Sequence, residues 1–252
     1  MSGKYMAYVG SYSYTGKAKG ITVFDVDVEN GMFKERCEIE VDNSSYVIAS
    51  SDGKTLYSIA DEGVVSFRIL PNGSLARLNS APIRGMRGCH LCTDEEDKYV
   101  FVSGYHDGKT TVLSLNPDGS VGKIVDGVFD RGYGSVAERN FRPHVTCTRR
   151  MPDNRFVLSV DNGIDQVKIY RFNDKEQRLV QVDAIRCPYP LYTAGSSGRN
   201  CLSIPPDAAQ GQLSRGIKSQ AHIPTFTDAK ASDRMQFASK LKFLRWALLW
   251  GR

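Results

Sequence analysis

Two short passages of this 252-residue sequence gather the side chains that could carry out chemistry. The first is Cys89-His90-Leu91-Cys92, which has the CxxC spacing found in metal and redox sites. A zinc site would need two further ligands, and a redox site would need a strand–helix–strand context. The sequence shows neither, so we interpret the spacing as incidental and expect no metal and no other cofactor.

The second passage runs from Arg139 to His144 and includes Arg142. Histidine titrates near working pH and can serve as a general base, whereas arginine binds phosphate groups and developing oxyanions. The carboxylates Asp161 and Asp165 follow shortly afterwards. They could suggest a cation site, but paired aspartates at a hairpin more often cap the turn.

The elements that must position these side chains form a repeat. Four segments each contain short strands rich in Val, Ile, Tyr, Phe and Leu, as in half-buried strands. An aligned aromatic or leucine residue of the third strand recurs at spacings of 43, 46 and 57 residues, at Phe24, Phe67, Leu113 and Tyr170. Four short strands at such a period are the signature of β-propeller blades. We therefore predict an all-β fold of about four four-stranded blades over residues 1–187.

Polar turns separate the third and fourth strands of each repeat. Three of these turns contain glycine, which accepts the positive φ that a tight hairpin requires. The four turns are Asn30-Gly31, Asn72-Gly73, Asp118-Gly119 and Asp174-Lys175.

Charge divides the chain into two parts. Residues 1–187 carry 24 Lys and Arg and 25 Asp and Glu, whereas residues 188–252 carry 9 basic and 3 acidic residues. The basic character belongs to the tail and does not indicate that the main part binds nucleic acid. No run of about 18 apolar residues occurs and no signal peptide is visible, so we expect no membrane span, reduced cysteines and a cytoplasmic location.

The tail, residues 188–252, lacks the strand pattern. Five of the ten prolines lie between residues 188 and 226, which favours loop or disorder. Near residues 228–250, apolar residues at helix-like spacing, with basic residues between them, would allow a short amphipathic helix for a membrane surface or a partner. The alternative is a sequence without a selected structure, such as a shifted reading frame would produce.

Several passages of the repeat resemble the motifs of one family. They are YVGSY at 8–12, RGCHL at 87–91, Gly104-Tyr105, RNFRPHVTC at 139–147 and DNGID at 161–165. Together they are similar to the seven-bladed lactonase family that includes bacterial 6-phosphogluconolactonase and fungal carboxymuconate cyclase. The resemblance covers residues 1 to about 187. It implies about four four-stranded blades of a seven-bladed ring, followed by a C-terminal tail that does not match.

The resemblance also implies roles for individual side chains. His144 would be catalytic, either as the base or as the group that orients the attacking water, and Arg139 would face phosphate or oxyanion. Arg142, Tyr105 and His90 would bind substrate. As alternatives, His90 and His144 would both be buried at blade starts and bonded to the backbone of neighbouring blades, and the two arginines would form surface salt bridges.

The sequence departs from the family pattern at three positions and after the fourth repeat. Gly88 stands at the usual proline, Gly104 at the usual asparagine and Thr146 at the usual second histidine. The family continues for about three blades, and its fifth blade carries an arginine and a glutamate that the resemblance assigns to the active site. Nothing after Cys187 matches them. We therefore expect low or no activity of this chain and self-association through open blade faces.

The function that the resemblance implies is hydrolysis of a sugar lactone. The substrate would be the small-molecule lactone 6-phospho-glucono-1,5-lactone, converted to 6-phosphogluconate in the pentose phosphate pathway. A carboxymuconate-type lactonising cyclase would use the same residues. A non-catalytic propeller scaffold and an inactive truncated product are further alternatives, and the reading frames downstream of Cys187 would test the last one.

Overall fold

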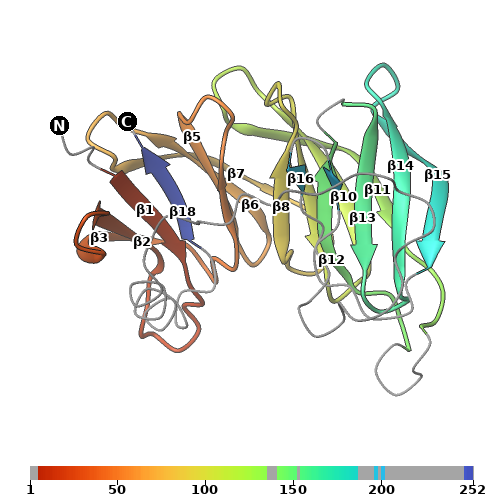
Figure 1. Cartoon of the computed structure of the whole chain (residues 1–252), viewed down its shortest axis with the longest axis horizontal. Coiled ribbons are helices and arrows are strands. Elements are labelled where there is room, and N and C mark those ends of the chain that lie inside the picture. The colour runs from red at the N-terminus through yellow and green to blue at the C-terminus, as the bar shows by residue number, and fades with distance from the viewer. Residues whose placement is uncertain are drawn as a thin grey trace.

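The structure, a computed structural model, describes residues 5–134, 141–151, 154–186, 196–197, 200–201 and 247–251. These residues form strands, turns and loops, and no helix occurs among them. Four four-stranded antiparallel sheets stand side by side in chain order (Figure 1). The predicted all-β fold of four blades is confirmed.

Each sheet corresponds to one repeat. Blade 1 contains β1 (Tyr5–Gly10), β2 (Gly20–Asp27) and β3 (Met32–Glu40). Blade 2 contains β4 (Val47–Ala49), β5 (Thr55–Ile59), β6 (Gly63–Ile69) and β7 (Leu75–Pro82). Blade 3 contains β8 (His90–Thr93), β9 (Tyr99–Gly104), β10 (Lys109–Leu115) and β11 (Val121–Phe129). Blade 4 contains β12 (Val145–Arg150), β13 (Phe156–Asp161), β14 (Gln166–Asn173) and β15 (Arg178–Arg186).

The first strand of blade 1 comes from the other end of the sequence. β18 (Ala247–Gly251) pairs antiparallel with β1, with Tyr5 opposite Gly251 and Val9 opposite Ala247. The sheet order β18-β1-β2-β3 gives β18 the place that β4, β8 and β12 hold in the other blades. The N- and C-terminal strands therefore lie side by side (Figure 1).

The rest of the tail is described only in part. β16 (Ser196–Ser197) and β17 (Asn200–Cys201) form a two-stranded ladder. The expected helix near residues 228–250 falls mostly outside the described residues, and its last positions belong to β18. In the described part of the chain, no helix has the length and apolarity that a membrane span requires.

A β-bulge recurs at the same place in every blade. The register between the third and fourth strands shifts immediately before the aligned residue of the repeat in blades 1, 2, 3 and 4. Those residues are Phe24, Phe67, Leu113 and Tyr170. Because a bulge increases local twist, this shared position gives all four sheets a similar curvature.

Apolar side chains fill the spaces between successive blades. Phe67 joins blades 1 and 2, Leu91 belongs to the cluster between blades 2 and 3, and Phe101 packs against blade 4. A hydrogen bond between blades 1 and 2 adds to this packing: the Tyr8 hydroxyl donates to the carbonyl of Gly73 at 2.8 Å. Gly73 has φ +81°, as the predicted hairpin turn requires.

Candidate functional site

The segments that lead into the innermost strands meet at one end of the sheets. Ser45, before β4, donates from Oγ to the carbonyl of Gly88 at 3.2 Å. Cys89, before β8, donates from Sγ to the carbonyl of Val145 at 3.3 Å. The segments 43–46, 87–89 and 141–145 therefore lie next to one another, and we call this end the mouth.

Two glycines allow the backbone before β12 to approach its neighbours closely. A Cβ on Gly163 would lie 1.9 Å from the carbonyl oxygen of Arg142 and 2.7 Å from the backbone nitrogen of His144. Gly108 has φ +62°, and a Cβ there would lie 2.5 Å from the Cβ of Pro143. The β13–β14 and β9–β10 turns thus confine the segment that carries His144.

The imidazole of His144 is held in one orientation. Its Nδ1 lies 2.7 Å from the carbonyl oxygen of Tyr105, so Nδ1 must carry a proton and donate it. The two rings stack at 4.4 Å with an interplanar angle of 15°. In the neutral ring, Nε2 is then the nitrogen without a proton, and it has no hydrogen-bond partner among the described residues. This tautomer is the one that a general base at Nε2 requires.

Asp161 fixes the backbone of the same segment. Its Oδ1 accepts hydrogen bonds from the backbone N–H groups of His144 and Gly163 at 2.8 Å, and from that of Ile164 at 3.2 Å. The side chain therefore caps the β13–β14 turn, as the sequence suggested, and it also connects that turn to His144. No group of metal-ligating side chains occurs in the described part of the chain.

A second carboxyl group lies behind Asp161. Asp130 Oδ1 accepts from Lys168 Nζ at 2.9 Å and from the hydroxyl of Tyr170 at 3.0 Å. The Oδ2 atoms of Asp130 and Asp161 are both buried and have no hydrogen-bond partner among the described residues. Burial, together with the neighbouring Asp130 carboxyl, raises the pKa of Asp161 to about 7.

His90 is buried between three blades. Only 3% of it is exposed, and its ring lies 4.7 Å from that of Tyr46. Nδ1 accepts from the backbone N–H of Thr148 at 3.5 Å, so Nε2 donates to Cys147 Sγ at 3.6 Å. Burial, together with the positive charge of Arg149, lowers the pKa of His90 to about 3. These contacts match the structural alternative for His90, bonding to the neighbouring blade.

The two cysteines of the CxxC spacing point to different partners. Cys89 donates to the carbonyl of Val145, whereas Cys92 donates to that of Thr93 at 3.2 Å. Burial raises the pKa of Cys89 to about 12 and also raises that of Cys92. Both thiols are therefore protonated at neutral pH, which makes them poor nucleophiles and poor metal ligands.

The remaining predicted residues lie around His144 or outside the described residues. Tyr105 contacts His144 directly through its ring and its carbonyl. Arg142 is exposed, with its guanidinium 5.5 Å from the centre of the Phe141 ring. Arg139 lies outside the described residues. The structure thus brings Tyr105 and His144 together and leaves His90 on the buried side of the mouth.

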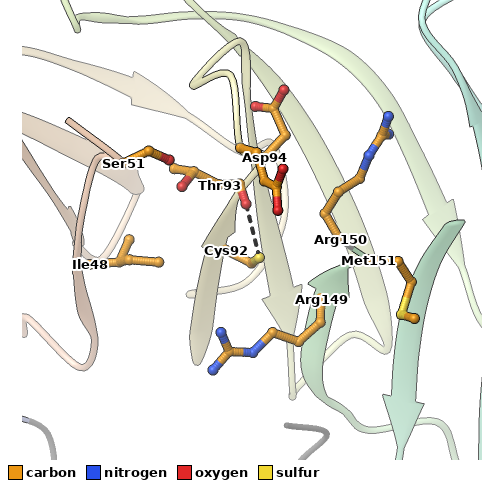
Figure 2. Close-up of a pocket in the computed structure, with 9 residues that line it drawn as sticks. Ile48, Ser51, Cys92, Thr93, Asp94, Arg149, Arg150 and Met151 are labelled. Atoms are coloured by element: carbon orange, nitrogen blue, oxygen red, sulfur yellow. Dashed lines mark hydrogen bonds between the residues drawn. The ribbon is translucent and has the colours of Figure 1, made fainter. Parts of the chain in front are cut away.

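A cavity of 220 Å³ lies at the opposite ends of the innermost strands (Figure 2). Its lining includes Cys92 from β8 and Arg149 from β12. The Nε atom of Arg149 is buried without a hydrogen-bond partner among the described residues. Arg149 lies five positions after His144, which corresponds to about 17 Å of extended chain. The cavity is therefore separate from the mouth.

Sequence reasoning missed several polar residues of the mouth and of the buried pair. Asp130 and Lys168 are ordinary charged residues of a strand end and a strand, and nothing local indicates that they meet. Arg87 is the first residue of the RGCHL motif, so its position was a signal that the prediction did not use. Asp61 lies in a plain turn, and its contacts with Arg87 and Asn43 are what distinguish it.

The sequence of this chain is similar to those of one protein family and of several known proteins. The family described as "Lactonase, 7-bladed beta-propeller" matches residues 6–200. A 6-phosphogluconolactonase of Bacillus subtilis is 33% identical over 177 residues, which cover 68% of this chain and 50% of the relative. An uncharacterized protein of Staphylococcus saprophyticus is 28% identical over 175 residues, or 66% of this chain and 50% of that protein. The chain spans about half the length of the curated relatives it matches.

Solved structures show the same fold. A provisionally assigned 6-phosphogluconolactonase of Bacteroides fragilis superposes with a TM-score of 0.67 at 31% identity, over 73% of this chain and 55% of that one. The periplasmic gluconolactonase of Pseudomonas aeruginosa also gives a TM-score of 0.67, at 23% identity, over 73% of this chain and 56% of that one. The second likeness supports the fold alone.

Proposed function

This chain belongs to the seven-bladed β-propeller lactonase family, and we propose that it contributes the catalytic base of an enzyme that hydrolyses a sugar lactone. The resemblance drawn from the motifs is confirmed at the level of the family. The observation that carries the proposal is the orientation of His144. Its Nδ1–H donates a hydrogen bond to the Tyr105 carbonyl, which leaves Nε2 to accept a proton.

In the proposed reaction, His144 Nε2 takes a proton from a water molecule, and the water oxygen attacks the lactone carbonyl carbon. The carbonyl oxygen then carries the negative charge of a tetrahedral intermediate. When this intermediate collapses, the ring C–O bond breaks. The imidazolium returns the proton to the departing ring oxygen, which becomes a hydroxyl group, and the product is an open-chain acid.

The arginines of the same segment complete the proposed site. Arg139 and Arg142 would stabilise the oxyanion or bind a phosphate group, and Tyr105 would contact substrate beside His144. We propose that His90 instead supports the mouth from behind, because it is 3% exposed and its contacts are to blade 4. The buried, neutral imidazole suits that structural role.

The proposed substrate is 6-phospho-glucono-1,5-lactone, since the Bacillus subtilis relative is named for that activity. The pentose phosphate pathway and a cytoplasmic location are parts of the same proposal. They are supported by the Bacillus subtilis relative. The test is acid release from the lactone by the purified chain, after subtraction of spontaneous hydrolysis. No release above the spontaneous rate, from this chain or from a ring-complete chimera, would contradict the proposed function.

We further propose that the 252-residue chain alone turns over slowly and self-associates. The family motifs with the arginine and glutamate of the fifth blade have no counterpart after Cys187. On β15, Val180 and Val182 are 47% and 45% exposed, and such apolar surface favours association. Light scattering alongside turnover tests both parts. A monomer with turnover in the ordinary enzyme range would contradict this proposal.

The chimera for these measurements joins residues 1–186 of this chain to the remaining blades of the Bacillus subtilis relative. If the chimera hydrolyses the lactone rapidly while the 252-residue chain does not, the missing groups account for the difference. If both proteins are equally slow, the residues assigned from this chain are wrong.

A further inference from the structure

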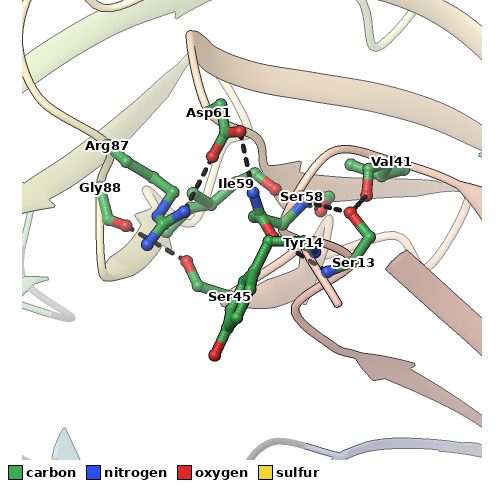
Figure 3. Close-up of polar contacts among 10 residues, drawn as sticks. Ser13, Tyr14, Val41, Ser45, Ser58, Ile59, Asp61, Arg87 and Gly88 are labelled. Atoms are coloured by element: carbon green, nitrogen blue, oxygen red, sulfur yellow. Dashed lines mark hydrogen bonds and ion pairs between the residues drawn. The ribbon is translucent and has the colours of Figure 1, made fainter. Parts of the chain in front are cut away.

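Asp61, in the turn between β5 and β6, connects three loops at the mouth (Figure 3). Its Oδ1 accepts from Arg87 Nη1 at 2.8 Å, and its Oδ2 accepts from Asn43 Nδ2 at 2.8 Å. Asn43 Oδ1 in turn accepts from the backbone N–H groups of Ser13 and Tyr14 at 2.9 and 3.0 Å. One carboxylate therefore fixes loops that belong to blades 1, 2 and 3.

This network holds two exposed aromatic rings in place. Tyr12 is 40% exposed and Tyr14 is 75% exposed, and their ring centres lie 5.8 Å apart. The guanidinium of Arg87 lies 4.9 Å from the centre of the Tyr12 ring. Exposed aromatic rings on a well-anchored loop offer apolar contact area at little cost in conformational entropy. Such an arrangement is typical of a binding surface.

The polar groups beside these rings suit hydroxyl groups. Arg87 has five N–H donors, of which Asp61 takes one, and the Arg87 side chain is 28% exposed. The Asp61 carboxylate supplies acceptors within the same cluster. A sugar hydroxyl both donates and accepts, so it can use the two kinds of group together. A phosphate group only accepts, and the Asp61 carboxylate would repel it.

The cluster lies next to the surroundings of His144. The backbone N–H of Met86 donates to Asp107 Oδ2 at 2.9 Å, and Asp107 belongs to the turn that also carries Tyr105. Cys89, two residues after Arg87, contacts the carbonyl of Val145. The loop that holds Arg87 thus touches the first blade on one side and the His144 segment on the other.

We propose that Tyr12, Tyr14, Asp61 and Arg87 form a subsite for the hydroxyl-bearing six-membered ring of the substrate. The proposal rests on the proposed function, because the ring is that of the lactone. The aromatic rings contact the C–H face of the sugar, while Arg87 and Asp61 exchange hydrogen bonds with neighbouring hydroxyls. The reacting carbonyl group then lies toward His144.

The test uses the full 252-residue chain and 1,5-anhydroglucitol, a stable sugar ring without a carbonyl group. Binding is followed by ligand-observed NMR, with tetrahydropyran, which lacks hydroxyls, as the control ligand. We expect saturable binding of the sugar ring only. Arg87→Ala and Tyr12→Leu should each weaken it roughly tenfold, whereas Tyr12→Phe should retain it.

Arg36→Ala is the matched control, because Arg36 forms a similar half-exposed pair with Asp25 on the outer part of blade 1. It should leave sugar binding unchanged. Tyr14→Ala provides a second variant in case Arg87→Ala does not fold, as judged by circular dichroism. Absence of saturable binding, or equal binding by all variants, would overturn the subsite.

The failure of this subsite can be told apart from failure of the proposed function. Lactone hydrolysis that survives Arg87→Ala with unchanged KM overturns the subsite alone. Sugar binding that depends on Arg87, without any lactone hydrolysis by the ring-complete chimera, supports the subsite and overturns lactone hydrolysis.

Discussion

His144 and Arg87 lie at the same mouth but are held in different ways. His144 is 7% exposed, and buried backbone groups position it through the Tyr105 carbonyl and Asp161. The Arg87 side chain is 28% exposed, and the side chains of Asp61 and Tyr12 orient it. A buried hydrogen bond is costly to lose, whereas an exposed contact is screened by water. The two regions should therefore respond to substitution on different scales.

The largest effect is expected at the His144 imidazole itself. His144→Ala should lower kcat for the lactone by roughly two to four orders of magnitude, the usual contribution of a general base. Steady-state kinetics of the ring-complete chimera would measure it. Cys92→Ala is the control and should leave kcat nearly unchanged, because Cys92 lines the distant cavity. Equal losses in the two variants would show that neither residue is specific to the chemistry.

The next effect concerns the close approach at Gly163. Gly163→Ala should destabilise the chain by about 2–4 kcal/mol, because its Cβ would lie 1.9 Å from the Arg142 carbonyl oxygen. Chemical denaturation and kcat should change together, since the crowded segment carries His144. Gly16→Ala is the comparison: it has φ +71° but open space around it, so the cost should be about 1 kcal/mol. A similar loss of stability in both variants would show that Gly163 does not confine the segment that carries His144.

The raised pKa of Asp161, behind His144, predicts a pH dependence of stability. The folded pKa of Asp161, about 7, exceeds the ordinary value of 3.8, so the folded state binds more protons between about pH 4 and 7. This group therefore makes the free energy of unfolding fall as pH rises through that range. Asp161→Asn keeps an acceptor for the His144 N–H and should remove this component. Urea denaturation between pH 4 and 8 would measure the difference from the unmodified chain.

The lowered pKa of His90 changes the free energy of unfolding with pH in the opposite direction. Its effect must therefore be measured separately from that of Asp161. Its folded pKa of about 3 lies below the ordinary 6.5, so the unfolded state binds more protons between these values. This component makes the free energy of unfolding rise with pH up to about 6.5. His90→Asn should remove it. If neither variant changes the pH profile, the two buried groups do not titrate as described.

The smallest effect is expected at the exposed edge of the Arg87 region. Tyr14→Ala should change the free energy of unfolding by less than about 0.5 kcal/mol, because the side chain is 75% exposed. It should raise KM a few-fold without changing kcat. A large loss of stability would show that Tyr14 is a structural residue, and the contrast with His144 would then be wrong.

Much of the fold could be predicted because its signals are local. Strand alternation and the Asn-Gly and Asp-Gly turns depend only on residues that are adjacent in the sequence. They therefore identify four repeats before any contact is known. The aligned Phe67 and Leu113 even mark the recurring bulge. His144 was found from its motif, but its tautomer depends on the Tyr105 carbonyl, 39 positions earlier.

The sequence by itself determined the strands, the hairpins, the repeat and the family motifs, since each rests on residues that are close in the chain. Only the tertiary structure decided that His90 is bonded across a blade interface, where it meets Thr148 and Cys147. It also placed β18 beside β1 and brought Lys168 to Asp130. Such pairings join distant residues whose types are common, and local patterns contain no information about which partner each will meet.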